Sequence, residues 1–229
     1  AAAEERGATG REALAAIVAG NEVVCRVGMA APGEFHRRGF HPTAICGVFG
    51  GTAAVASLAG LDADATTRAL GIAGSFAAGI LADGTPTKPM HPAWAAHGAH
   101  LAVSLARHGA IGPASVLEGK FGLYHAFLAA EEGEIDIAGQ VSDLGVRWET
   151  PRIAFKPYPV CHFMHGSLGA AADALAFRRW ASMGALAPAI TVFIWIAALA
   201  PGAPHAARAA GAVAVTAAAF LALANQVLR

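Results

Sequence analysis

Cysteine and net charge are both scarce in this sequence. Its 229 residues include only 3 Cys, and 16 Lys+Arg balance 16 Asp+Glu. Cys25, Cys46 and Cys161 are odd in number, far apart and without a CxxC pair, so neither a disulfide framework nor a cysteine-based zinc site is supported. No basic run interleaved with aromatic residues is present, so we expect no nucleic-acid partner. These absences indicate a cytoplasmic protein.

Acidic residues are absent from the last part of the chain. Every Asp, Glu and Lys lies at or before Asp173, and residues 178–229 contain four Arg, one His and no acid. Residues 180–200 form an uncharged stretch as long as a bilayer span, and residues 209–224 form a shorter one. Two interpretations stay open: a membrane hairpin, so that membrane contact would run only through this tail, or a tail foreign to the fold that precedes it.

Apolar spacing predicts a mainly α protein. Residues 11–30 have the spacing of an amphipathic helix with one buried side. Residues 44–61 are apolar or small almost throughout, which predicts a buried helix that packs closely through Gly and Ala. Helix-start and helix-stop residues predict further helices over 62–82 (capped by Asp62), 92–108 (from Pro92 to a stop at Gly109) and 166–177.

The remaining segments are less regular. Short helices are expected within 114–130, and Pro, Gly and polar residues predict loops over 31–43, 83–91 and 131–145. Apolar residues around Pro151 predict a strand over 147–155.

Lysine is rarer than any other charged residue, and two of the three lysines stand beside prolines. Lys88 precedes the helix predicted to begin at Pro92, where helix N–H groups would add to its charge, and Lys156 opens the string KPYP. Such positions suit a carboxylate or phosphate, although a lone Lys in a proline-rich turn is more often only solvated. His41, in FHPT, is a candidate for proton transfer, and the plainer interpretation is a loop histidine that caps the next helix.

Metal, nucleotide and cysteine chemistry receive little support. Histidines recur within 91–108, but no carboxylate or Cys stands near them at ligand spacing, so we expect no metal. The string GVFGG (47–51) matches no dinucleotide or phosphate-loop pattern, so no nucleotide cofactor is implied. Cys161 stands next to His162, yet adjacency is not the geometry of a nucleophile and its base, and a small buried residue is the plainer interpretation.

Six strings of this chain resemble the MmgE/PrpD family in order and spacing over about residues 10–176. They are GNEVVCRVG (20–28), RGFHPTAICGVFGGTAAVASLAGLD (38–62), ALGIAGSFAAGI (69–80), TKPMHPAWAAHGAHLAVSLARHGAIGP (87–113), VLEGKFGLYHAF (116–127) and FKPYPVCHFMHGSLGAAADAL (155–175). The resemblance implies a cofactor-free enzyme of di- or tricarboxylates, such as 2-methylcitrate dehydratase, cis-aconitate decarboxylase or iminodisuccinate epimerase. It also implies a homodimer in which a large all-helical domain and a smaller α+β lid enclose the active site.

Carried over block by block, the resemblance assigns site residues. His41, Lys88 and Lys156 become the catalytic residues, with His41 for proton transfer and the lysines as electrostatic clamps. Four others are expected to bind substrate: Thr43, His91, Cys161 and His162. Cys161 stands where some relatives have a histidine.

Two departures from the family predict an incomplete member. The acidic residue and the further active-site histidine that precede this region in the family are absent, and after Leu175 the chain lacks the polar lid sequence. We therefore expect a partial helical domain over 1–145, the start of an α+β lid over 146–177, and an atypical apolar helical tail over 178–229.

The expected function is that of a hydro-lyase. A 2-methylcitrate-like substrate would lose water after abstraction of the proton alpha to a carboxylate. The alternatives are an epimerase or decarboxylase of the same family, or a catalytically dead, membrane-associated remnant.

Overall fold

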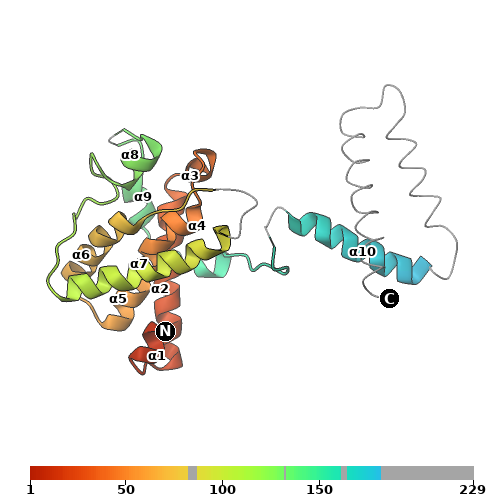
Figure 1. The fold of residues 1–229 in the computed structure, drawn as a ribbon, viewed down its shortest axis with the longest axis horizontal. Coiled ribbons are helices and arrows are strands. Elements are labelled where there is room, and N and C mark those ends of the chain that lie inside the picture. Colours follow the sequence, from red (N-terminus) through yellow and green to blue (C-terminus); the bar gives the residue numbers. More distant parts are fainter. Residues whose placement is uncertain (82–86, 132, 161–163, 182–229) are drawn as a thin grey trace. The chain divides into compact units, whose positions relative to one another are not determined.

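The computed structural model describes residues 1–81, 87–131, 133–160 and 164–181, with side chains as far as residue 175 (Figure 1). The chain divides into two compact units, Ala1–Ile153 and Ala154–Arg229, and each is described by itself. Within the described residues all elements are helical, and the β pairing is limited to one isolated antiparallel bridge between Phe40 and Ile80. The predicted mainly α class is therefore confirmed.

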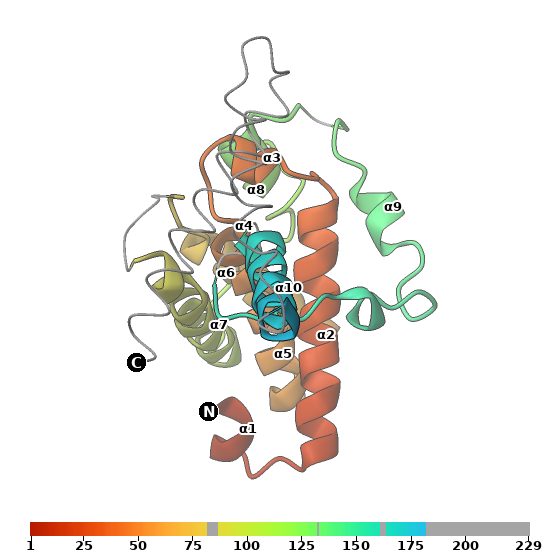
Figure 2. The same cartoon turned by 90° about the vertical axis from the view of Figure 1, so that its right-hand side faces the viewer.

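The first long helix, α2 (Gly10–Met29), follows the short α1 (Ala2–Glu5) and confirms the helix predicted over 11–30. A reciprocal cap fixes its start. The Thr9 hydroxyl oxygen accepts the Glu12 N–H at 3.3 Å, and the Glu12 carboxylate accepts the Thr9 N–H at 2.7 Å. Figure 2 shows α2 running along the first unit, with α9 on its far side from α7.

The central helix of the first unit is α5 (Gly47–Ala59), which packs against α2, α6 and α7. Glycine permits this packing, because a Cβ added at Gly50 would lie 2.7 Å from the Gly20 carbonyl oxygen of α2. By length and composition, Pro42–Ala59 is long and apolar enough to cross a membrane. Phe49 and Val48 are nevertheless almost wholly enclosed by the neighbouring helices, as expected of a core helix.

Two further helices complete the packing around α5. Asp62 caps α6 (Ala63–Ala73), because its carboxylate accepts the Ala65 N–H at 2.7 Å. This helix is shorter than predicted. It passes into the 3-10 turn η1 (Gly74–Phe76), and the chain then takes a left-handed conformation at Gly79 (φ +131°). By contrast, α7 (His91–Arg107) ends before Gly109 (φ +86°), as predicted.

Segments expected to be loops contain short helices. Residues 31–43 include α3 (Glu34–Arg37) and the start of α4 (Pro42–Ile45), and residues 131–145 include α9 (Ile137–Val141). Their four or five residues are too few to produce a recognisable apolar period. Within 83–91 the structure describes η2 (Lys88–Met90), and within 114–130 it places α8 (Leu123–Leu128).

The strand predicted over 147–155 is wrong. Thr150–Arg152 instead form a 3-10 turn, η3. The backbone N–H groups of Glu149 and Thr150 donate to the Glu22 carboxylate at 2.6 and 3.1 Å, so a side chain of α2 takes the donors that a sheet would need. The alternating apolar residues favour a strand, but this tertiary contact stabilises the turn instead.

In the second unit, α10 (His165–Ala181) confirms the helix predicted over 166–177. The Tyr158 and His165 rings lie edge to face at 5.6 Å. The apolar stretch 209–224, and all but the start of 180–200, lie outside the described residues, so the two interpretations of the tail stay predictions.

Candidate functional site

His41 lies where the chain enters α4. Its backbone is extended (φ −85°, ψ 107°), and the next residue, Pro42, suits a first helical turn. The His41 N–H donates to the Gly79 carbonyl at 3.0 Å, and the Leu81 N–H donates to the Gly39 carbonyl at 2.7 Å. Two stretches far apart in sequence thus fix the backbone of His41. Its side chain makes no capping hydrogen bond to α4, so the helix-cap interpretation is not met.

The side chain of His41 meets His91, the first residue of α7. Their Nδ1 atoms are 2.9 Å apart, and the ring centroids are 5.1 Å apart with the planes inclined by 48°. Both residues are half-buried. At this distance the Nδ1–H of one ring donates a hydrogen bond to the unprotonated Nδ1 of the other.

Glycine makes room for this contact. A Cβ added at Gly79 would lie 2.6 Å from the Ala44 Cβ and 3.4 Å from the His91 Nδ1. Residue 79 therefore has to be small as well as left-handed for the chain to pass between α4 and the start of α7.

Lys88 and Thr43 belong to the same part of the first unit. Lys88 begins η2, three residues before His91, and is half-buried. Thr43 is exposed in α4, two residues after His41. The predicted site residues of the first unit thus gather around the beginnings of α4 and α7, which contact each other.

The other predicted site residues lie elsewhere. Lys156 belongs to the second unit, between η3 and α10. Cys161 and His162 fall outside the described residues. The roles predicted for these three stay predictions.

Within the described segments, no group of three or more His, Cys, Asp and Glu side chains could hold a metal ion. A hollow of about 460 Å³ lies between α6, η1 and the segment leading into α8, and its lining includes Lys120, Ser75 and Ser115. None of the predicted site residues of the first unit lines this hollow.

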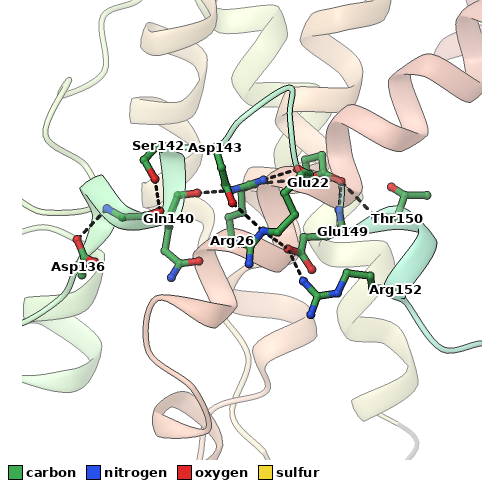
Figure 3. Close-up of polar contacts among 11 residues, drawn as sticks. Glu22, Arg26, Asp136, Gln140, Ser142, Asp143, Glu149, Thr150 and Arg152 are labelled. Atoms are coloured by element: carbon green, nitrogen blue, oxygen red, sulfur yellow. Dashed lines mark hydrogen bonds and ion pairs between the residues drawn. The ribbon is translucent and has the colours of Figure 1, made fainter.

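Sequence reasoning missed a buried ionic network on α2 (Figure 3). Arg26 and Glu22 are each only 4% exposed, and the Arg26 Nε donates to the Glu22 carboxylate at 3.3 Å. Arg26 also donates to Asp143 at 2.6 Å, to the Arg147 carbonyl at 2.7 Å and to the Gln140 carbonyl. The sequence feature that could have indicated this network is the spacing of Glu22 and Arg26, four residues apart within an otherwise apolar helix face.

The network shifts the pKa values of two of its members. The hydrogen bond from Arg26 is the main reason that the pKa of Asp143 lies below its ordinary value, and the same bond raises the pKa of Arg26. Both groups stay charged at neutral pH. This cluster holds the segment from α9 to η3 against α2, which is a structural role.

Cys46 carries no nucleophilic chemistry at neutral pH. Burial raises the pKa of its thiol to about 12, and only 2% of the residue is exposed. It belongs to the same hydrophobic core cluster as Val27 and Phe49, which is the position of a small apolar residue.

Comparison with known proteins identifies relatives of this chain. The family model described as the MmgE/PrpD N-terminal domain matches residues 1–136. A cis-aconitate decarboxylase-like protein, oryM of Aspergillus oryzae (strain ATCC 42149 / RIB 40), is 30% identical over 169 residues, which cover 71% of this chain and 35% of the relative. A cis-aconitate decarboxylase of Aspergillus terreus is 30% identical over 174 residues, which cover 72% of this chain and 36% of the relative. The chain therefore spans about a third of the length of the curated relatives it matches.

Proposed function

Because this chain belongs to the MmgE/PrpD family, we propose that it forms part of a lyase that acts on a small di- or tricarboxylate without a cofactor. The observation that carries the proposal is the grouping of His41, Lys88 and His91 around the beginnings of α4 and α7. This group combines a side chain able to transfer protons near neutral pH with an ammonium group.

The chemistry of such a site follows from its residue types. A C–H bond next to a carboxylate breaks only if a base takes the proton and nearby positive charge stabilises the enolate-like anion that develops. His41 supplies the base, and the ammonium group of Lys88 supplies the charge.

Two reactions use the same groups in different order. In dehydration, His41 takes a proton from carbon, the hydroxyl group on the neighbouring carbon leaves, and the proton held by His41 passes to it so that water departs. In decarboxylation, loss of CO2 leaves the negative charge on carbon, and a His41 that has taken up a proton from solvent donates it to that carbon. The relatives are a cis-aconitate decarboxylase and a cis-aconitate decarboxylase-like protein, which favours decarboxylation as the second candidate beside the dehydration expected from sequence.

The test begins with binding, which does not require a complete catalytic apparatus. The chain is titrated with cis-aconitate and with 2-methylcitrate by calorimetry, and release of CO2 and formation of an unsaturated acid are followed in the same samples. We expect Lys88→Ala to weaken binding roughly ten- to a hundredfold, the value of one charge-assisted hydrogen bond. We expect His41→Gln to bind normally and to lose about 10²- to 10⁴-fold in turnover.

Arg107→Ala is the matched control for Lys88→Ala. Arg107 is an exposed cation at the other end of α7, so its removal changes the net charge equally without touching the site. Equal losses of affinity in Lys88→Ala and Arg107→Ala would show that only overall charge matters. That outcome, or the failure of both acids to bind, would reject the proposed site.

A further inference from the structure

We propose that His91 is a positioning residue, which couples the tautomer of His41 to its own by sharing one proton between the two Nδ1 atoms. The two Nδ1 atoms are 2.9 Å apart. Two protonated Nδ1 atoms would direct their N–H groups at each other, and two unprotonated ones would oppose their lone pairs. Only the arrangement with one donor and one acceptor is a hydrogen bond.

The shared proton makes the two rings complementary. A neutral imidazole has one proton, so the ring that donates through Nδ1 has an unprotonated, basic Nε2. The ring that accepts at Nδ1 must carry its proton on Nε2. The pair therefore contains one base and one proton donor at the same time, and the hydrogen bond requires the two rings to have opposite tautomers.

The protein holds both rings in place from different elements. His91 begins a helix of 17 residues, whereas His41 precedes Pro42 and is tied to the Gly79 carbonyl. The two residues are 50 positions apart in sequence, so the contact exists only in the folded first unit. A half-buried hydrogen bond of ordinary strength favours opposite tautomers in the two rings over the same tautomer in both roughly tenfold.

The positioning role deepens, and rests on, the function proposed above, but the shared proton does not depend on it. In that function, the reaction requires His41 to present the correct protonation state at the nitrogen that faces the substrate. His91 provides this without having to touch the reacting atoms.

The test reads the proton directly in the full chain. The protein is labelled with ¹⁵N-histidine and studied by NMR at mildly alkaline pH, above the ordinary titration range of histidine. We expect His41 and His91 to show opposite neutral tautomers and a ¹⁵N–¹⁵N coupling across the hydrogen bond between their Nδ1 atoms. The same tautomer in both rings, together with no coupling, would overturn the proposal.

Variants separate positioning from simple folding. His91→Phe keeps a ring but removes the partner nitrogen, so we expect the single tautomer of His41 to become a mixture. His91→Asp places a carboxylate, which only accepts hydrogen bonds, where the Nδ1 stood, so we expect it to hold His41 with its proton on Nδ1. His97→Asp on the same helix is the control, because His97 is exposed and stacks on Trp94 with their ring centroids 5.7 Å apart.

The outcomes distinguish this inference from the proposed function. If His91→Phe leaves the tautomer of His41 unchanged, His91 does not position it. If His91→Phe does not fold, the coupling and the opposite tautomers in the unaltered chain decide alone. Opposite tautomers in a protein that binds neither acid would keep the shared proton and reject the lyase.

Discussion

Arg26 holds the segment from α9 to η3 against α2, and its removal provides a quantitative test of the buried network. The proposed change is Arg26→Met, which keeps an unbranched apolar stem and removes the guanidinium group. Four hydrogen bonds would be lost, to Glu22, Asp143, and the carbonyls of Gln140 and Arg147.

The magnitude follows from what stays buried. The Glu22 side chain is only 5% exposed and would keep two backbone N–H donors but lose its cation. Removing one partner of a buried ion pair costs about 3–5 kcal/mol, because the other charge is left without compensation. For a unit of this size, that loss corresponds to a decrease in Tm of about 6–20 °C.

The assay is urea unfolding followed by circular dichroism, with hydrogen exchange measured over residues 137–152. We expect the amides of Glu149 and Thr150 to exchange faster, because they donate to Glu22. The double variant Glu22→Gln with Arg26→Met should be more stable than Arg26→Met alone, since it leaves no buried charge unpaired.

Arg37→Met is the matched control. Arg37 pairs with Glu34, but its side chain is 65% exposed, so solvent screens this pair and it contributes little to stability. If Arg26→Met destabilises the protein no more than Arg37→Met does, the buried network does not hold the segment, and the reasoning from burial is refuted.

Three further predictions concern packing, reactivity and pH. Gly50→Ala should destabilise by about 1–3 kcal/mol in urea unfolding, because its Cβ would meet α2, whereas Gly10→Ala, with nothing within 4 Å, should change stability little. Cys46 should react with a thiol reagent at pH 8 only after unfolding, because burial raises the pKa of its thiol to about 12. Peptide mapping would identify the labelled cysteine, and rapid labelling of Cys46 in the folded chain would contradict this prediction. The lowered pKa of Asp143 means that its bond to Arg26 stabilises the fold at pH values above the ordinary aspartate range. This stabilisation is lost as the pH falls through the pKa of Asp143 in the folded chain, so the difference in stability between the unaltered chain and Asp143→Asn should shrink in acid. A difference that does not change with pH would exclude this linkage.

The long helices could be predicted from local features of the sequence. The apolar period of α2, the Asp62 cap of α6, and the Pro92 and Gly109 boundaries of α7 all operate within a few neighbouring residues. The short helices and the 3-10 turn at Thr150–Arg152 could not be predicted in this way, because α2 supplies the hydrogen-bond partner of that turn.

For the candidate site, the sequence by itself determined which side chains are available. His41, Lys88 and His91 stand out because lysine is scarce and because their strings resemble those of a family. Only the tertiary structure decided that His41 and His91 share a hydrogen bond, and that Glu22 and Arg26 are buried partners of a segment more than 110 residues away. The physical reason is that helix periods and caps depend on neighbours along the chain, whereas the pairing of polar groups depends on which surfaces packing brings together.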